Sequence, residues 1–146
     1  MSDPRFEKFT KEAKQALVVA QEKSRESGLN YVGTEHLLIG ILTQNHSLGA
    51  SILMNFGVSL DNVYLVLKTV GRAQTGQAAQ GKGGGLSGFA KQVIEDALKC
   101  AHEFGHNFVG TEHLLFSLCS QENTAATVIL ENMKINPQSI REQLIQ

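Results

Sequence analysis

The sequence contains little proline and little cysteine, with two residues of each in a chain of 146. Of the residues, 42% are hydrophobic and 18% are charged. Together with the low proline content, this composition excludes fibrous and disordered chains and favours a globular protein. The cysteines, Cys100 and Cys119, form no CxxC pair and are too few for a disulfide framework, which favours a reducing compartment. We therefore expect a cytoplasmic protein.

The sequence also has no excess of positive or negative charge, and it has no long apolar run. Its 13 Lys and Arg residues are balanced by 14 Asp and Glu residues, which gives a net charge of -1. A nucleic-acid-binding protein needs a basic face to neutralise phosphates, so we expect no nucleic-acid partner. The segment Met1–Lys14 is charged and polar, and no later apolar run approaches the length of a membrane span. We therefore expect neither export nor insertion into a membrane.

One segment of the sequence occurs twice. The residues "NYVGTEHLLIGIL" occupy Asn30–Leu42, and "NFVGTEHLLFSLC" occupies Asn107–Cys119. We call the shift in residue number from Asn30 to Asn107 the repeat offset. At this repeat offset, residues 9–69 align with residues 86–146 without a gap, which indicates a tandem duplication. Between the copies, Gly71–Gly85 contains six glycines and no apolar periodicity, which is typical of a flexible linker.

Each copy has the apolar periodicity and the boundary residues of four helices. In the first copy we expect helices between Thr10 and Gly28, from Thr34, at Ser47–Phe56 and from Ser59; in the second, between Ser87 and Gly105, from Thr111, at Thr124–Met133 and from Pro137. We also expect Tyr64 on the buried side of the fourth helix. No segment alternates with the period of a strand for more than a few residues.

Two small units with such a pattern are expected to share one core. A unit of about sixty residues buries its core poorly by itself, so we expect the copies to pack about an approximate two-fold axis. The prediction is one all-α domain over residues 1–146, with the first repeat at 9–70, the linker at 71–85 and the second repeat at 86–146. Two equivalent sites, one in each copy, would follow from this arrangement.

The repeated Gly-Thr-Glu-His segment has a simple structural interpretation. Gly33 and Gly110 would give a turn its backbone freedom, and the threonine that follows would cap the next helix. The glutamate then falls in the first helical turn, where the helix dipole favours a negative charge. For His36 and His113 we expect a packed or hydrogen-bonded role rather than a metal, because neither has a second ligand at a fixed helical spacing.

These motifs resemble a known family. Phe9-Thr10 followed by a helix, then the segment from Asn30 to Leu38, and the same pattern again from Ser87, closely resemble the double Clp-N repeat of ClpC-type AAA+ protein unfoldases. The resemblance implies the all-α Clp N-domain fold, with two four-helix Clp-N repeats. It also implies a domain that docks protein substrates and adaptor proteins for a Clp ATPase ring feeding a protease. A stand-alone Clp-N protein that binds the Clp machinery is the alternative.

The resemblance further implies a ligand, phosphoarginine, bound at two equivalent sites. By matching positions, Glu35 and Glu112 would hold the guanidinium groups, and Thr10 and Ser87 would face the phosphates. A hydroxyl at a helix N-terminus suits a phosphate, and the lysines one turn further along would add positive charge. These lysines are Lys14 and Lys91.

Other motifs point to chemistry less specifically. Gly76–Lys82 fits G-x-x-x-x-G-K, the phosphate-binding loop of an NTPase, but Gly83 stands where Ser or Thr is needed and no strand precedes the loop. His102 and His106 are four residues apart, but no third metal ligand is evident. We therefore expect no catalytic residue, no metal and no cofactor in this chain, and a binding module rather than an enzyme.

Overall fold

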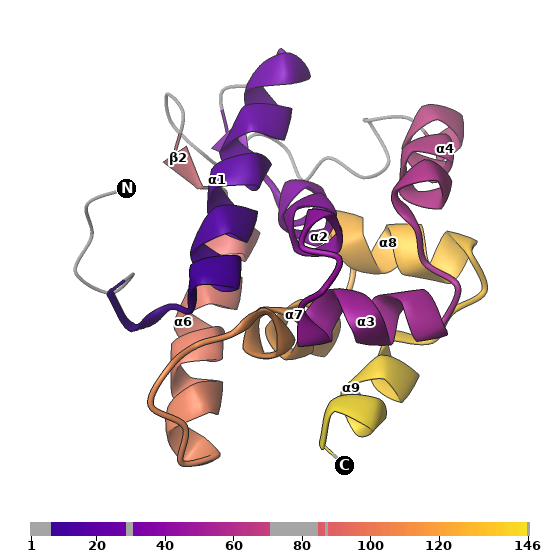
Figure 1. The fold of residues 1–146 in the computed structure, drawn as a ribbon. Coiled ribbons are helices and arrows are strands. Elements are labelled where there is room, and N and C mark those ends of the chain that lie inside the picture. The colour runs from indigo at the N-terminus through magenta and orange to yellow at the C-terminus, as the bar shows by residue number, and fades with distance from the viewer. Residues whose placement is uncertain (1–6, 29–30, 71–84, 87, 146) are drawn as a thin grey trace.

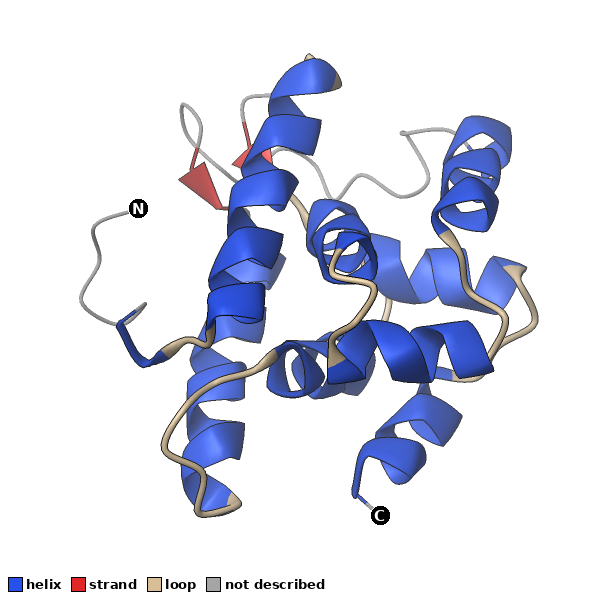
Figure 2. Cartoon of the chain, in the orientation of Figure 1, coloured by secondary structure: helices blue, strands red, loops and turns tan. Residues whose placement is uncertain are grey.

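The computed structural model describes residues 7–28, 31–70, 85–86 and 88–145. This part of the chain forms eight α-helices and two strands of two residues each (Figure 1, Figure 2). In chain order the elements are α1 (Lys11–Glu26), β1 (Tyr31–Val32), α2 (Thr34–Thr43), α3 (Leu48–Asn55), α4 (Leu60–Val70), β2 (Gly85–Leu86), α6 (Gly88–Glu103), α7 (Thr111–Ser120), α8 (Ala125–Asn132) and α9 (Pro137–Ile145). The all-α prediction is confirmed.

Several helices begin or end at the residues that local signals predict. The Thr10 hydroxyl accepts a hydrogen bond from the Ala13 N–H at 3.1 Å, and the Thr124 hydroxyl accepts from the Thr127 N–H at 3.2 Å. Each satisfies one of the amides that a helix N-terminus leaves without a partner inside the helix. Gly28 follows α1 with a positive φ of 76°, a conformation that glycine adopts without steric cost. The predicted cap Ser87 lies outside the described residues.

The two short strands were not predicted, because two residues are too few to show an alternating pattern. β1 pairs in parallel with β2, with Val32 opposite Leu86, and an isolated bridge joins Phe9 to Val109. The repeat offset converts one pair into the other. The segment before the first helix of each copy therefore pairs with the segment before the second helix of the other copy. Of the predicted linker, residues 71–84 lie outside the described residues, and Gly85 belongs to β2.

A second exchange between the copies involves Thr34 and Thr111, which were expected to cap their own helices. Gly33 and Gly110 occupy the cap positions of α2 and α7 instead. The Thr34 hydroxyl accepts from the Ala126 N–H of α8 at 3.0 Å, and the Thr111 hydroxyl accepts from the Gly49 N–H of α3 at 2.9 Å. Each threonine therefore caps a helix in the other copy. These reciprocal bonds are consistent with the approximate two-fold symmetry of the fold.

The core lies around α2 and α7, which sit between α1 and α6 on one side and the remaining helices on the other (Figure 1). Leu37, Leu38, Leu114 and Leu115 are at most 2% exposed, as predicted. Tyr64 was expected in this core, but 41% of it is exposed, because α4 turns that side chain toward a pocket at the surface. No single helix in the described ranges is long and apolar enough to span a membrane; only α2 and α3 together would qualify, and they meet at 98°.

Candidate functional site

The repeated Gly-Thr-Glu-His segments form the same local structure in both copies. The Gly33 N–H donates to His36 Nδ1 at 2.9 Å, and the Gly110 N–H donates to His113 Nδ1 at 2.8 Å. Both histidines are buried. Their predicted hydrogen-bonded role is confirmed, because each side chain caps the start of its own helix.

The reason for the two glycines differs from the one expected. Gly33 and Gly110 have φ values of −99° and −104°, which any residue can adopt, so backbone freedom does not require glycine here. A Cβ atom added to Gly33 would collide with Oε1 of Glu35, and one added to Gly110 would collide with Oε1 of Glu112. Glycine is therefore needed so that each glutamate side chain can fold back over the start of its helix.

His113 is part of a pair of histidines. Its Nε2 lies 2.7 Å from Nδ1 of His106. Because Nδ1 of His113 accepts from the Gly110 N–H, the proton of the neutral His113 ring must be on Nε2, from which it is donated to His106. Burial lowers the pKa of His113, the negative charge of Glu112 opposes this shift, and His106 adds to it. The geometry thus suits the uncharged imidazole.

A pocket of about 240 Å³ lies where the N-termini of α1, α3 and α7 converge. Its lining residues come from the start of each of these helices and from the loop before α3: Thr10, Glu12, His46, Ser47, Leu48, Gly110, Thr111 and Glu112. Three helix N-termini give such a pocket a positive potential, while the two carboxylates supply negative charge beside it. The pocket can therefore receive a ligand that carries both an anionic and a cationic group.

The structure brings together only some of the residues predicted for the ligand site. Thr10 of the first copy shares the pocket with Glu112 of the second, so this site is built from both copies rather than within one. Lys14 and Lys91 are exposed, and neither is among the residues that line the pocket. Glu35 lies in a different pocket, and Ser87 lies outside the described residues.

Two further residues of the pocket were missed by the sequence analysis. Glu12 Oε2 lies 3.8 Å from His46 Nε2, an ion pair when the histidine is protonated. Glu12 follows the predicted cap of α1 by two residues, and His46 lies in the loop before α3. Polar residues at such positions are ordinary on a protein surface, so no signal in the sequence distinguishes them.

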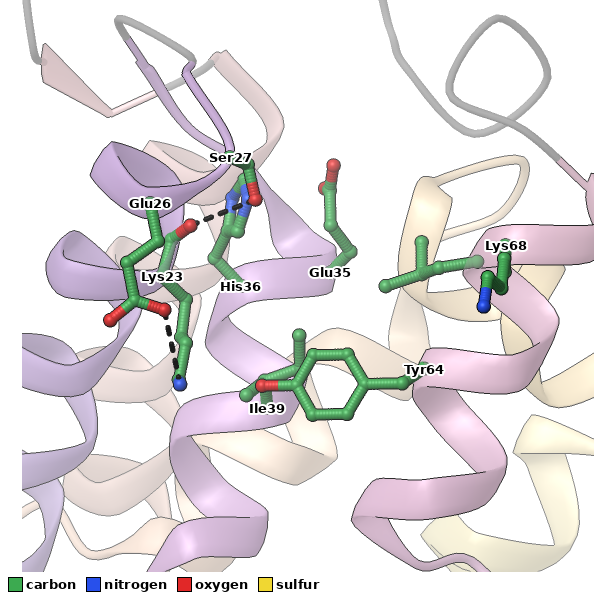
Figure 3. A pocket seen from close by; sticks show the side chains of 9 residues that line it. Lys23, Glu26, Ser27, Glu35, His36, Ile39, Tyr64 and Lys68 are labelled. Carbon is green, nitrogen blue, oxygen red and sulfur yellow. Dashed lines mark hydrogen bonds and ion pairs between the residues drawn. The ribbon is translucent and has the colours of Figure 1, made fainter.

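A second, larger pocket of about 510 Å³ opens between α1, α2 and α4 of the first copy (Figure 3). The residues that line it are Lys23, Glu26, Ser27, Glu35, His36, Ile39, Tyr64, Leu67 and Lys68. Lys23 Nζ lies 3.3 Å from Glu26 Oε1. The hydrogen bond to Glu26, with the nearby Tyr64 phenol, raises the pKa of Lys23. The pocket therefore combines apolar side chains with charged ones.

The two cysteines lie in the core. Burial raises the pKa of Cys100, as do the negative charges of Glu103 and Glu112. Burial also raises the pKa of Cys119 to about 12, although Arg141 acts in the opposite direction. Both thiols are therefore protonated near neutral pH, which makes them poor nucleophiles.

Comparisons with known proteins agree with the doubled architecture. The family model of the Clp repeat (R) N-terminal domain matches residues 8–87 and again residues 85–146. Chaperone protein ClpC1 of Arabidopsis thaliana, named as chloroplastic, is 35% identical over 142 residues, which is 97% of this chain and 15% of that protein. The ATP-dependent Clp protease ATP-binding subunit ClpA homolog of Porphyra purpurea is 36% identical over 142 residues, 97% of this chain and 17% of that protein. The chain thus spans about one sixth of the length of these curated relatives.

Solved structures show the same fold. The N-terminal domain of ClpD from Arabidopsis thaliana superposes with a TM-score of 0.82 at 19% identity, covering 99% of this chain and 97% of that one. The N-terminal domain of Hsp104 from Candida albicans superposes with a TM-score of 0.72 at 17% identity, covering 94% of this chain and 89% of that one.

Proposed function

The chain belongs to the Clp repeat N-terminal domain family, and from this premise we propose that it is a docking module that delivers protein substrates and adaptor proteins to a Clp ATPase ring. The family resemblance predicted from the repeated Gly-Thr-Glu-His segments is confirmed. The finer part of the proposal is that the domain recognises phosphoarginine on proteins marked for degradation.

The observation that carries this finer proposal is the pocket that joins Thr10 to Glu112. Phosphoarginine places a phosphate directly beside a guanidinium group, so its site must offer an anion-binding surface next to a carboxylate. The converging N-termini of α1, α3 and α7 suit the phosphate, and the Thr10 hydroxyl lies among them. The carboxylate of Glu112, together with that of Glu12, suits the guanidinium group.

The two-fold exchange of contacts extends the proposal to a second site. At the repeat offset, Thr10 and Glu112 exchange with Ser87 and Glu35. The second site would then combine Glu35 of the first copy with Ser87 at the start of α6. Lys14 and Lys91 would contribute as flexible, exposed cations near the phosphates rather than as part of the pocket wall.

The proposal is tested by titrating the protein with a phosphoarginine-containing peptide in a calorimeter. We expect binding at two sites, and Glu112→Gln should weaken one of them. A charge-assisted hydrogen bond is worth about 1.5–3 kcal/mol, so affinity at that site should fall about tenfold to a hundredfold. The same peptide with unmodified arginine should bind far more weakly, because it lacks the phosphate.

The matched control is Glu122→Gln, which makes the same chemical change at an exposed residue outside the pocket. It should leave binding unchanged. Absence of phosphoarginine binding by the folded wild-type protein would leave only the docking of adaptors and substrates. Undiminished binding by Glu112→Gln would remove this glutamate from the site.

A further inference from the structure

The larger pocket lies between α1, α2 and α4 of the first copy. The second copy carries different residues at several of the positions that line this pocket. At the repeat offset, three residues that line it correspond to larger or longer side chains in the second copy. The pairs are Ser27 with Phe104, Ile39 with Phe116, and Tyr64 with Arg141.

In the second copy these side chains pack against one another. The rings of Phe104 and Phe116 meet edge to face, with centroids 6.0 Å apart and an interplanar angle of 75°. The Arg141 guanidinium lies over the Phe116 ring, 4.9 Å from its centroid. At positions that correspond to the lining of the open pocket, the second copy thus carries aromatic rings and a guanidinium group that pack on one another.

We propose that the open pocket of the first copy binds the same pair of groups from another polypeptide: an aromatic side chain with a basic residue next to it. The volume of about 510 Å³ lies within the usual range of about 300–1,000 Å³ for ligand pockets. Ser27 in place of Phe104 and Ile39 in place of Phe116 leave room for the incoming ring.

The walls of the pocket match both groups of this ligand. Ile39 and Leu67 offer an apolar surface to the ring, and the exposed Tyr64 ring can stack with a cation, as Phe116 does with Arg141. Figure 3 shows Tyr64 reaching from α4 toward Ile39 of α2.

The pocket favours a cation over an anion. Lys23 is already held by Glu26, and Lys68 is exposed, where water and salt screen its charge. The negative face of the Tyr64 ring attracts a cation and repels an anion. The basic group of the ligand is therefore expected to stack on Tyr64, as Arg141 stacks on Phe116.

The test uses three capped dipeptides as probes, titrated into the whole 15N-labelled chain and followed by NMR. Acetyl-Phe-Arg-amide should produce saturable shifts at the amides of Ser27, Ile39 and Tyr64. Acetyl-Ala-Arg-amide lacks the ring and acetyl-Phe-Glu-amide reverses the charge, so each should bind about tenfold more weakly or worse.

A variant that copies the second repeat gives the sharpest comparison. Ser27→Phe introduces the ring found at Phe104, at an exposed position where it should not impair folding, and should abolish binding of acetyl-Phe-Arg-amide. Val18→Phe adds the same ring at an exposed position of α1 outside the pocket and should bind like the wild type. Any of four results would overturn the proposal. They are undiminished binding by Ser27→Phe, equal binding of the three probes, chemical shift changes confined to the Thr10 pocket, and no binding by the wild type at millimolar probe.

This inference does not rest on phosphoarginine recognition. Ser27→Phe should leave phosphoarginine binding in the Thr10 and Glu112 pocket unchanged, since Ser27 is not among its lining residues. A wild-type chain that binds acetyl-Phe-Arg-amide but no phosphoarginine would support this proposal and exclude the other one.

Discussion

Replacing Thr111 with valine should show how much one exchanged hydrogen bond stabilises the fold. Valine has nearly the same shape as threonine, so the change removes the acceptor of the Gly49 N–H and little else. Gly49 is buried, and its amide nitrogen lies 2.9 Å from Thr111 Oγ1. A buried donor without an acceptor costs about 1–3 kcal/mol.

That loss would be large against the total stability of a domain, which is typically about 5–15 kcal/mol. Urea unfolding followed by circular dichroism should show a lower midpoint with an unchanged m-value. The transition should stay single, because Thr111 of the second copy holds α3 of the first. Thr34→Val should cost a similar amount, since its hydroxyl makes the equivalent bond to the Ala126 N–H.

The control is Ser120→Ala, which removes an exposed hydroxyl that bonds to the Phe116 carbonyl within the same helix. It should change the free energy of unfolding by less than about 0.5 kcal/mol. An effect of Thr111→Val as small as that of the control, or two separate transitions in the wild type, would refute the idea that these bonds join the copies.

Two further predictions concern residues of the second copy. Lys134 has a φ of 64° where the first copy has Gly57, so Lys134→Gly should raise the free energy of unfolding by about 0.5–1 kcal/mol in urea titrations; a loss would show that the lysine side chain stabilises the turn. His113 has a lowered pKa in the folded protein, so its contribution to stability should be complete above about pH 6.5, the ordinary histidine value, and be lost as the pH falls through the lower folded value. Unfolding measured from pH 8 to pH 5 should show this loss, and it should be smaller in His113→Gln; an equal slope in both proteins would place the pH dependence elsewhere.

The helix boundaries could be predicted because the interactions that set them are local. Thr10 and Ser47 cap helices through amides three residues ahead, and Gly28 ends α1 through its own positive φ. Such bonds involve residues within a single turn, so their spacing is visible in the sequence. The buried Leu37 and Leu38 follow from the helical periodicity in the same way.

The partners of buried polar groups could not be predicted in this way. The bonds from Gly49 to Thr111 and from Ala126 to Thr34 join residues 62 and 92 positions apart. Sequence spacing carries no information on which copy supplies the acceptor, because both threonines occupy the same place in their repeats. From the sequence alone, each hydroxyl is therefore expected to cap its own helix.

The amino-acid sequence alone determined the duplication, the all-α class, the family, and a packed or hydrogen-bonded role for His36 and His113. The tertiary structure alone decided that Thr10 and Glu112, from different copies, line one pocket, and that α1, α2 and α4 of the first copy surround another. The difference is physical: caps and helical periodicity depend on neighbours along one helix, whereas a pocket depends on how separate helices pack, which local sequence does not encode.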